Sequence, residues 1–377
     1  MGNFLRHYKM QITALSPIHV GSGEIISKKG YIYTPWDHQV IVPDVQKMYK
    51  ALQERGKEKE FELYMMNGKD GQLALGQWLQ KNNCSKQDYE MWKRYTMDAG
   101  ETFTSDKTRR PKEIHAFIKD AYGMPYIPGS TIKGMIRTAL IAWKIHCEPD
   151  KYEELKRTIQ RKAKEKGSRN QFLLNETNRL EQSILYDLGR DRKTPWNAVN
   201  DCMAGLRVGD SLPVKTDCLT LAQKIDYTLQ GEEKALPLLR ESLIPRTKIY
   251  FDITIDTSAF PYSMKDITEA LDYFQEICYK YFYSRFHRGK SESGLVWLGG
   301  GCGFLSKTVL YSMLGSDAVE VIDGIYHSTL GKNYQTHKHT RDKGLKLAPH
   351  VCKCTKYQGQ LYDMGMGRIE IVQSSHE

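Results

Sequence analysis

Two stretches of the sequence share one layout, YIPGSTIKGMIRTALI at residues 126–141 and GLVWLGGGCGFLSKTVLYSML at residues 294–314. In each, a short apolar segment leads into a glycine-rich turn, and an apolar run typical of a helix follows. One such turn in each half of the chain predicts an α+β fold made of two ferredoxin-like units. We expect the first unit at residues 1–195 and the second at residues 196–377.

Local patterns agree with this fold. Residues 1–56 predict three strands and then a helix with Asp44 as its N-cap. The stretch TKIYFDITID (residues 247–256) alternates strictly, which places its isoleucines and its phenylalanine on one face of a strand. Two largely helical insertions are expected, at about residues 57–112 and 150–194. The second is dense in charge, so we expect it to project from the core as a helical pair.

The composition favours a polyanionic partner. The chain has 377 residues and a formal net charge of +10, because 55 Lys and Arg outnumber 45 Asp and Glu. The eight cysteines are scattered, which favours a reducing, cytoplasmic setting over a disulfide framework. No segment has the pattern of a signal peptide or the roughly 20 apolar residues of a membrane helix, so we expect no membrane association. No cofactor motif stands out, and we expect none.

The first glycine turn has the features of an anion site at a helix N-terminus. We expect Gly129 to adopt a positive φ and Ser130 or Thr131 to cap the helix. Lys133 and Arg137 are four residues apart, so they share a helix face, which we expect to be exposed. A tight turn that serves only to reverse the chain is the alternative interpretation.

The second turn has four glycines within five positions, followed by Lys307. The glycines, which would let a backbone approach a ligand closely, are Gly299, Gly300, Gly301 and Gly303. The segment GCGFLSKT is close to a nucleotide-binding P-loop, but Ser306 replaces the glycine before the lysine, which disfavours NTP hydrolysis. Two basic turns that both open helices favour anion binding over simple chain reversal.

Two further segments carry residues suited to RNA. SPIHVGSG places His19 near Gly21, and this histidine is a candidate general base, although an RNA-contacting or structural role is favoured. KYFYSRFHRGKSESG (residues 280–294) interleaves aromatic residues with cations, as single-stranded nucleic-acid sites do. Its candidate contacts are Arg285, Arg288 and Lys290. Cations that stabilise the C-terminal end of a helix are an equally supported interpretation.

A region rich in histidine and cysteine near the C-terminus raises the question of a metal site. In HVCKCTKY, the residues His350, Cys352 and Cys354 alternate along a predicted strand, and His337 and His339 precede it. The single C-x-C differs from the C-x2-C pairs usual in zinc sites, so we expect the cysteines to be small apolar core residues and no metal to be bound. Metal binding by the five residues stays open at this point.

Four segments resemble those of a known family. SPIHVGSG, YIPGSTIKGMIRTAL, LRVGDS and WLGGGCGFLSKT are similar, in order and spacing, to segments of the RAMP proteins of type III CRISPR–Cas effector complexes. The resemblance covers nearly the whole chain. It is strongest to the fifth Csm subunit of type III-A systems, for which the GGG-x-GFLSKT element is more specific than the others.

The resemblance implies two RRM-like (ferredoxin-like) folds and a non-catalytic crRNA-binding subunit, present once at the end of the effector filament. Such a subunit caps the 3′ end of the crRNA and supports crRNA maturation and complex assembly in antiviral defence. The implied partners are crRNA, other Csm subunits (especially the backbone RAMP subunit and the small subunit), host nucleases that trim the 3′ end and, indirectly, target RNA. The implied contacts are the glycines of both turns with Ser130, Lys133, Arg137 and Lys307.

An enzymatic role is the alternative. RAMP relatives that process crRNA use histidine-centred cleavage without a metal, and His19 would be the general base of such an endoribonuclease. The sequence lacks the aromatic RNP motifs of RRM proteins, so we expect loops to contact the RNA backbone rather than a sheet to stack on bases.

Overall fold

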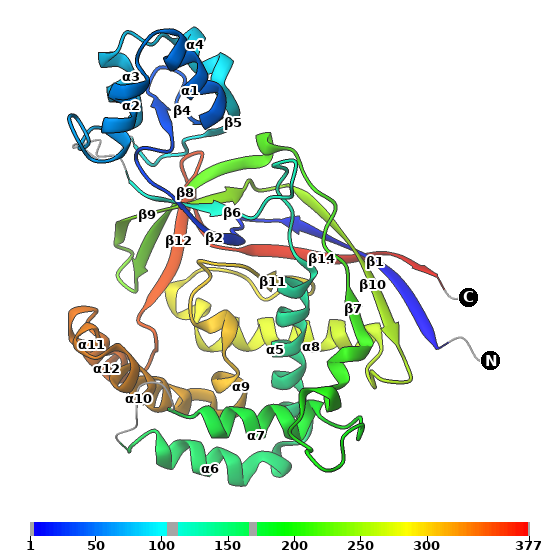
Figure 1. Ribbon diagram of the computed structural model, residues 1–377. Helices are drawn as coiled ribbons and strands as arrows, with labels where there is room; N and C mark the ends of the chain where they lie inside the picture. The colour runs from blue at the N-terminus through cyan, green and yellow to red at the C-terminus, as the bar shows by residue number, and fades with distance from the viewer. Residues whose placement is uncertain (1–3, 104–111, 166–171, 376–377) are drawn as a thin grey trace.

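A computed structural model describes residues 4–103, 112–165 and 172–375. The protein is α+β, as predicted, and its strands form two sheets with helices packed against them (Figure 1). Parts of both predicted insertions, residues 104–111 and 166–171, lie outside the described residues. Within the described ranges, no helix is long and apolar enough to cross a membrane.

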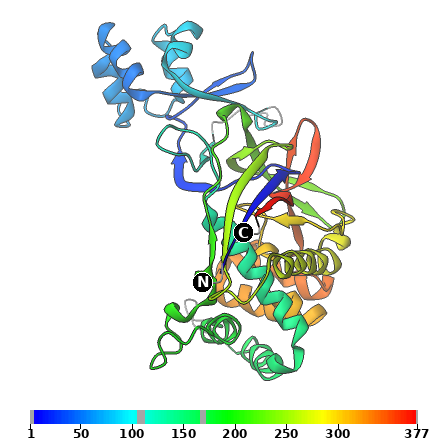
Figure 2. The same cartoon turned by 90° about the vertical axis from the view of Figure 1, so that its right-hand side faces the viewer.

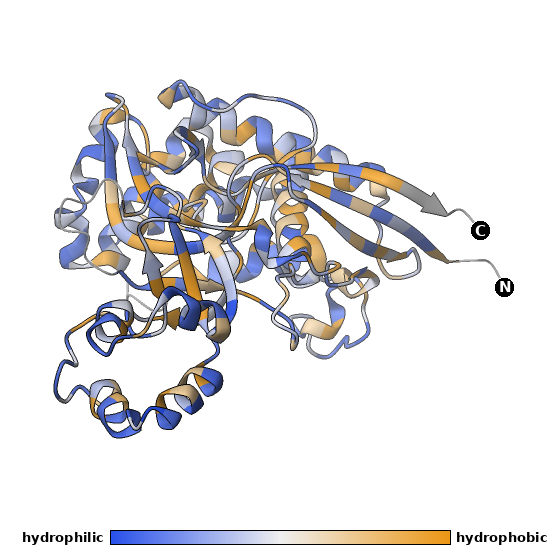
Figure 3. Ribbon diagram, turned by 90° about the horizontal axis from the view of Figure 1, so that it is seen from above, coloured by the Kyte–Doolittle hydropathy of each residue, from blue (hydrophilic) through white to orange (hydrophobic). Residues whose placement is uncertain are grey.

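The first sheet is antiparallel and holds five strands in the order β11-β14-β1-β10-β7. Their bounds are Leu295–Trp297 (β11), Met366–Ser375 (β14), Leu5–Ala14 (β1), Lys248–Asp256 (β10) and Leu206–Val208 (β7). The predicted face of β10 is confirmed, because its alternate apolar residues are all buried: Ile249, Phe251, Ile253 and Ile255. Hydrophobic and hydrophilic residues also alternate along the strands that run toward the two termini (Figure 3).

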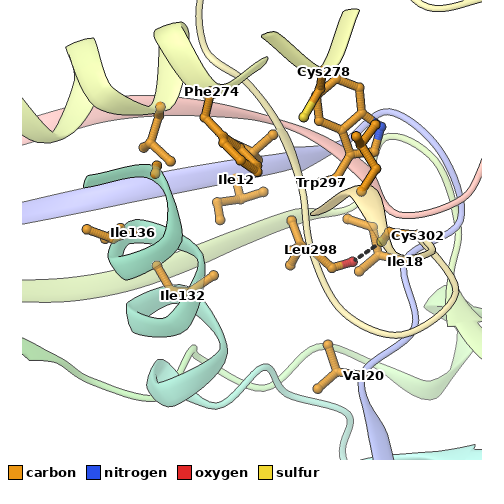
Figure 4. Close-up of a cluster of buried hydrophobic side chains, with 14 of the residues drawn as sticks. Ile12, Ile18, Val20, Ile132, Ile136, Phe274, Cys278, Trp297, Leu298 and Cys302 are labelled. Carbon is orange, nitrogen blue, oxygen red and sulfur yellow. Dashed lines mark hydrogen bonds between the residues drawn. The ribbon is translucent and has the colours of Figure 1, made fainter. Parts of the chain in front are cut away.

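Two long helices cover the buried face of this sheet, α5 (Gly129–Cys147) and α8 (Met264–Tyr281). Ile132 of α5, Ile12 of β1 and Phe274 of α8 belong to one apolar cluster (Figure 4). Further helices, most of them farther from the sheet in Figure 1, are α6 (Glu153–Lys162), α7 (Leu174–Leu185), α9 (Leu310–Leu314), α10 (Ala318–Leu330), α11 (Lys332–Thr336) and α12 (Asp342–Leu345).

The second sheet joins distant parts of the sequence in the order β2-β6-β9-β8-β5-β4-β3. Their bounds are Gly21–Ile26 (β2), Ile114–Phe117 (β6), Glu233–Leu243 (β9), Leu219–Thr228 (β8), Lys93–Asp98 (β5), Gln39–Pro43 (β4) and Ile32–Thr34 (β3). In addition, β12 (Val351–Tyr357) pairs with β8, and β13 (Gln360–Asp363) pairs with β12. Both sheets contain strands from both sides of residue 195. The two ferredoxin-like units with a boundary there stay a prediction.

Four short helices lie beside β3 and β4 at one end of the second sheet, away from α5 and α8 (Figures 1 and 2). They are α1 (Val45–Glu54), α2 (Glu58–Met65), α3 (Leu75–Lys81) and α4 (Lys86–Trp92). Asp44 caps α1 as predicted, since its carboxylate accepts hydrogen bonds from the amides of Gln46 and Lys47. The four helices share an apolar cluster with Ile32 of β3 and Ile41 of β4. Within it the rings of Tyr64 and Trp78 stack with centroids 5.0 Å apart.

The charged insertion forms two helices, α6 and α7, but the expectation that it projects from the core is wrong. Ile159 of α6 and Leu180 of α7 are buried in the main apolar cluster. Between the helices, the Lys162 ammonium lies 2.6 Å from the carboxylate of the buried Glu176. The charges dominate the composition of this segment, whereas a few well-spaced apolar residues anchor it.

The strands β2 and β9 are among those that the sequence patterns miss. β2 has the sequence GSGEII, whose small residues are typical of a loop, and most of the strand is exposed. β9 contains Pro237, and proline is unusual in a central strand because it cannot donate to the hydrogen-bond ladder. The pairing of β9 with β8 shifts register between Gln223 and Ile225, opposite the proline, so a local irregularity accommodates it.

Glu241 of β9 is a fully buried carboxylate. It accepts hydrogen bonds from the Tyr95 hydroxyl on β5 (2.6 Å) and from the Phe117 amide on β6 (2.8 Å), and it pairs with the Lys119 ammonium. The backbone carbonyl oxygen of Glu241 lies 2.6 Å from Nδ1 of His19. One residue thereby joins three strands of the second sheet and fixes the segment between β1 and β2.

Removing this charge should destabilise the fold. In Glu241→Gln the mostly buried Lys119 ammonium loses its counter-charge, so we expect the free energy of unfolding to fall by about 3 kcal/mol. Urea denaturation followed by circular dichroism measures the change. The matched control is Glu24→Gln on the exposed part of β2, with an expected change within about 0.5 kcal/mol. Equal stability of the two variants would contradict the central role of Glu241.

Candidate nucleic-acid interface

Three motifs from distant parts of the sequence meet in one groove. Gly21, Ser130, Lys307 and the loop at Gly299 and Gly300 line a cavity of about 400 Å³. The rest of its lining is Val20, Thr131, Gly134, Met135, Thr138, Trp297, Leu298 and Ser306. Figure 4 shows this region, with Val20, Leu298 and the first turns of α5 on different sides. We call this cavity the central groove.

The start of α5 is fixed by the LRVGDS segment. The amide of Gly129 donates to Oδ1 of Asp210 at 2.8 Å, and a Cβ on Gly129 would lie 2.1 Å from the carbonyl oxygen of Val208. Gly129 is therefore required by close packing against β7, and the expected positive φ is wrong. The expected capping by Ser130 or Thr131 is also wrong, because the N-cap residue is Pro128 and no side chain of the cap accepts a hydrogen bond.

The glycine loop is fixed by the backbone of His19. The amide of Gly300 donates to the His19 carbonyl oxygen at 2.7 Å. Gly299 has φ 82°, and a Cβ there would lie 2.1 Å from the same oxygen. These two glycines thus permit a close internal approach of backbone to backbone. The turn opens onto a single turn of 3-10 helix, Leu305–Lys307, and the short helix α9 rather than onto a long helix.

Lys307 and Lys133 differ in their surroundings. Lys307 is exposed at the rim of the central groove, and within the described residues no carboxylate lies at ion-pair distance from it. Lys133 is half-buried, and burial lowers the pKa of its amine against the opposing effect of Asp201. Lys307 is accordingly the cation that faces the groove most openly.

Arg137 does not lie on an exposed face, contrary to expectation. Its guanidinium pairs with Glu181 and with Asp201, each at 2.6 Å, and its side chain is 24% exposed. These contacts join α5 to α7 and to the segment before β7. Arg137 therefore has an internal role that the sequence spacing did not indicate.

Replacing Arg137 should affect folding more than replacing Lys133. Arg137→Ala leaves two partly buried carboxylates without their cation, so we expect the free energy of unfolding to fall by roughly 1–3 kcal/mol. Lys133→Ala should change it by less than about 0.5 kcal/mol. Thermal and urea denaturation of the two single variants measure both values. A stable Arg137→Ala protein would return this residue to the ligand-binding candidates.

The aromatic segment before β11 is part of the core rather than a stacking platform. Tyr283 stacks on Trp297 with ring centroids 4.7 Å apart, and both side chains are buried. Arg285 donates to the carbonyl oxygens at the end of α12, and Arg288 pairs with Asp363 at 2.5 Å. Lys290 stays exposed, 3.6 Å from Glu292. Helix ends and core packing thus account for most of this segment.

His19, the candidate general base, is buried beside the central groove. Because Nδ1 faces the Glu241 carbonyl oxygen, the ring proton is assigned to Nδ1, and Nε2 is the acceptor nitrogen. Burial lowers the pKa of His19 from 6.5 to about 4. The imidazole is therefore neutral at pH 7 and a weak base, which disfavours the endoribonuclease hypothesis.

The depressed pKa of His19 predicts a pH-dependent stability. The unfolded chain binds a proton at His19 more readily than the folded chain does. Protonation of His19 therefore leaves the free energy of unfolding unchanged above about pH 6.5 and lowers it as the pH falls toward 4. The loss is at most about 1.4 kcal/mol per pH unit. The stability difference between wild type and His19→Gln, measured with urea, should therefore be smaller at pH 5 than at pH 7. An NMR titration of His19 with its midpoint near pH 6.5 would contradict this.

Two cations beside the glycine loop carry no sequence motif. Arg240 of β9 and Lys224 of β8 are half-buried, and in the described part of the chain neither has a carboxylate at ion-pair distance. Nη1 of Arg240 lies 3.7 Å from the position of a Cβ on Gly301. Gly303 approaches the side chain of Lys353, whose amine pairs with Asp226. A half-buried cation without a counter-charge favours an anionic ligand. We call Arg240, Lys224 and Lys307 the unpaired cations.

The cysteines of the C-x-C segment are buried, as expected of core residues. Cys352 and Cys354 each lie 3.7 Å from Oδ1 of Asp363. His350 and His339 lie apart from them, next to Asp342. His337 is exposed.

The sequence matches proteins of one family. The model of the RAMP superfamily matches residues 11–306. The CRISPR system Cms protein Csm5 of Mycobacterium tuberculosis strain H37Rv is 30% identical over 393 residues, which cover 98% of this chain and 99% of that protein. The protein of the same name from Streptococcus thermophilus is 27% identical over 328 residues, or 82% of each chain.

Solved structures share the fold. A chain in the cryo-EM structure of a Csm–crRNA–target RNA ternary complex of a type III-A CRISPR–Cas system has a TM-score of 0.61 at 19% identity, covering 96% of this chain and 100% of its own. The crystal structure of T. onnurineus Csm5 has a TM-score of 0.60 at 20% identity, with 95% and 99% covered. The resemblance seen in the sequence is confirmed, and this chain belongs to the RAMP superfamily and, within it, to the Csm5 family.

Proposed function

We propose that this protein is a non-catalytic crRNA-binding subunit of a type III-A CRISPR interference complex. In this proposal it caps the 3′ end of the crRNA and supports crRNA maturation and complex assembly in antiviral defence. Its partners are crRNA, the other Csm subunits (especially the backbone RAMP subunit and the small subunit), host nucleases that trim the 3′ end, and target RNA indirectly. The relatives named Csm5 and the structural neighbour within a Csm–crRNA–target RNA complex support this proposal.

The observation that carries the proposal is the position of the unpaired cations. Nη1 of Arg240 lies 3.7 Å from the position of a Cβ on Gly301, and Lys307 lines the central groove together with Gly299 and Gly300. Cations already paired inside the protein would have to lose a carboxylate in order to bind a phosphate, whereas these would not. Phosphate oxygens are the commonest ligands of such cations in nucleic-acid interfaces. We propose that the RNA backbone runs past the glycine loop along the central groove, which Gly21 and Ser130 also line.

Single substitutions of the unpaired cations should weaken RNA binding and lower its salt dependence. When a cation that neutralises one phosphate of a single strand is removed, the slope of log K against log salt falls by about 0.7. We expect Arg240→Ala and Lys307→Ala each to show this change, measured by fluorescence anisotropy with labelled crRNA across a salt series. Lys265→Ala is the control, because this exposed lysine lies at the start of α8 and also removes one charge. Unchanged slopes in both groove variants would refute the proposed path.

The purified protein and labelled crRNA also test the enzymatic alternative. Labelled crRNA incubated with the protein and EDTA should stay intact, because the neutral, buried His19 is poorly suited to general base catalysis. Site-specific cleavage that vanishes in His19→Ala would establish the endoribonuclease instead.

Nuclease protection of crRNA in the reconstituted complex tests the 3′-end role. We expect the protected region to include the 3′ portion of the crRNA and to become shorter there in Arg240→Ala.

A further inference from the structure

Two histidines flank one buried carboxylate between α11 and β12. Nδ1 of His339 lies 3.0 Å from Oδ2 of Asp342, and Nδ1 of His350 lies 2.5 Å from Oδ1 of the same residue. The Asp342 side chain is fully buried, and the two imidazoles are 11% and 14% exposed. One ligand atom from each residue lies within 4.8 Å of the others.

The charge of Asp342 has no permanent cation beside it. Within the described residues, the two imidazoles are its partners at ion-pair distance, and an imidazole nitrogen, unlike a lysine or an arginine, can bind either a proton or a metal ion. The adjacent Lys343 extends to Asp323 instead, at 2.9 Å. A fully buried carboxylate is costly unless it is paired or coordinates a metal. A metal ion bound here would therefore balance a buried negative charge that has no lysine or arginine at ion-pair distance within the described residues.

The surrounding segment has only partial apolar packing, in which Tyr334 and Leu345 are half-buried against the main cluster. Between residues 331 and 346 the two buried side chains are His339 and Asp342. The segment is made of very short helices, α11, a 3-10 turn at His339–Arg341 and α12, none of which buries an apolar side chain. Helices this short are unstable in isolation. A link to His350, which directly precedes β12, would fasten the segment to the second sheet.

We propose that His339, Asp342 and His350 bind a divalent transition-metal ion, with Zn²⁺ as the best fit, and that this ion fastens residues 331–346 to the start of β12. Two imidazole nitrogens and one carboxylate oxygen are ligands that Zn²⁺ commonly accepts. Bonds of about 2.0–2.2 Å place tetrahedral ligands roughly 3.3–3.6 Å apart, so the contacts of 3.0 and 2.5 Å have to lengthen by roughly 0.3–1.1 Å when the ion enters. The ion replaces the two Nδ1 protons that the carboxylate otherwise accepts. Water or the neighbouring His337 completes the shell; the rings of His337 and His339 are 6.2 Å apart.

The other cluster of ligand types, Cys352, Cys354 and Asp363, fits a metal less well. The Asp363 carboxylate is already paired with the Arg288 guanidinium at 2.5 Å. Its charge is therefore balanced without a metal ion, and a metal there would lie next to a fixed cation. This contrast provides an internal control.

The test is metal binding by the full-length protein after treatment with a chelator. Titration with Zn²⁺ against a chromophoric competitor should give one site, and His339→Gln or Asp342→Asn should weaken it by roughly 100-fold. His327→Gln, which changes an exposed histidine of α10, and the double variant Cys352→Ser with Cys354→Ser should bind as wild type does. Zn²⁺ should also slow proteolysis within residues 331–346 in wild type.

The Co²⁺ spectrum of the wild-type protein keeps the proposal testable if a variant fails to fold. Visible absorption without a near-ultraviolet thiolate band is expected for nitrogen and oxygen ligands. A thiolate band, no stoichiometric binding of either metal, or tight binding by a folded Asp342→Asn protein would each overturn the assignment. None of these readouts involves RNA, so they stand apart from the proposed function.

Discussion

The position of the central groove depends on the buried contacts of Glu241. Its carboxylate is satisfied by groups from β5, β6 and the residue after them, and its carbonyl oxygen orients His19. The carbonyl oxygen of His19 in turn accepts a hydrogen bond from the amide of Gly300. A single buried acid thus connects the second sheet, through one histidine, to the glycine loop that forms a wall of the groove. Buried polar groups of this kind are stable only when every partner is present, which makes the arrangement specific.

Internal pairing separates the cations of this protein into two groups. Arg137 and Arg288 neutralise carboxylates inside the chain, and Arg285 binds the carbonyl oxygens at a helix end. Their removal would expose unpaired partners, so weaker RNA binding in such variants would not identify a site of RNA contact. Arg240 and Lys307 have no such partners within the described residues. The effect of removing either charge on RNA binding can therefore be attributed to the ligand. Whether a cation has an internal partner depends on its surroundings and cannot be recognised from residue type.

Strictly local signals in the sequence predicted local structure well. The alternation in β10 and the Asp44 cap both depend on neighbouring residues, and both are confirmed. The groove was predicted as two separate turns, because nothing in the sequence indicates that Asp210 binds Gly129 or that Gly299 packs on His19. Arg240 was missed because β9 itself was not predicted and no motif surrounds this residue. The aromatic segment at Tyr283 was ambiguous for a physical reason: stacking in a core and stacking on bases require the same side chains.

Two of the backbone amides that suggested an anion site already have acceptors inside the protein. The carboxylate of Asp210 accepts a hydrogen bond from the amide of Gly129 at the start of α5, and the carbonyl oxygen of His19 accepts one from the amide of Gly300. In the proposed function, these two amides are not available to RNA while they keep their internal hydrogen bonds, so side-chain charge carries more of the contact. Contacts of this kind act on phosphates and carry no sequence information. Such an interface suits a subunit that holds a guide RNA, because in RNA-guided complexes base pairing rather than the protein reads the sequence.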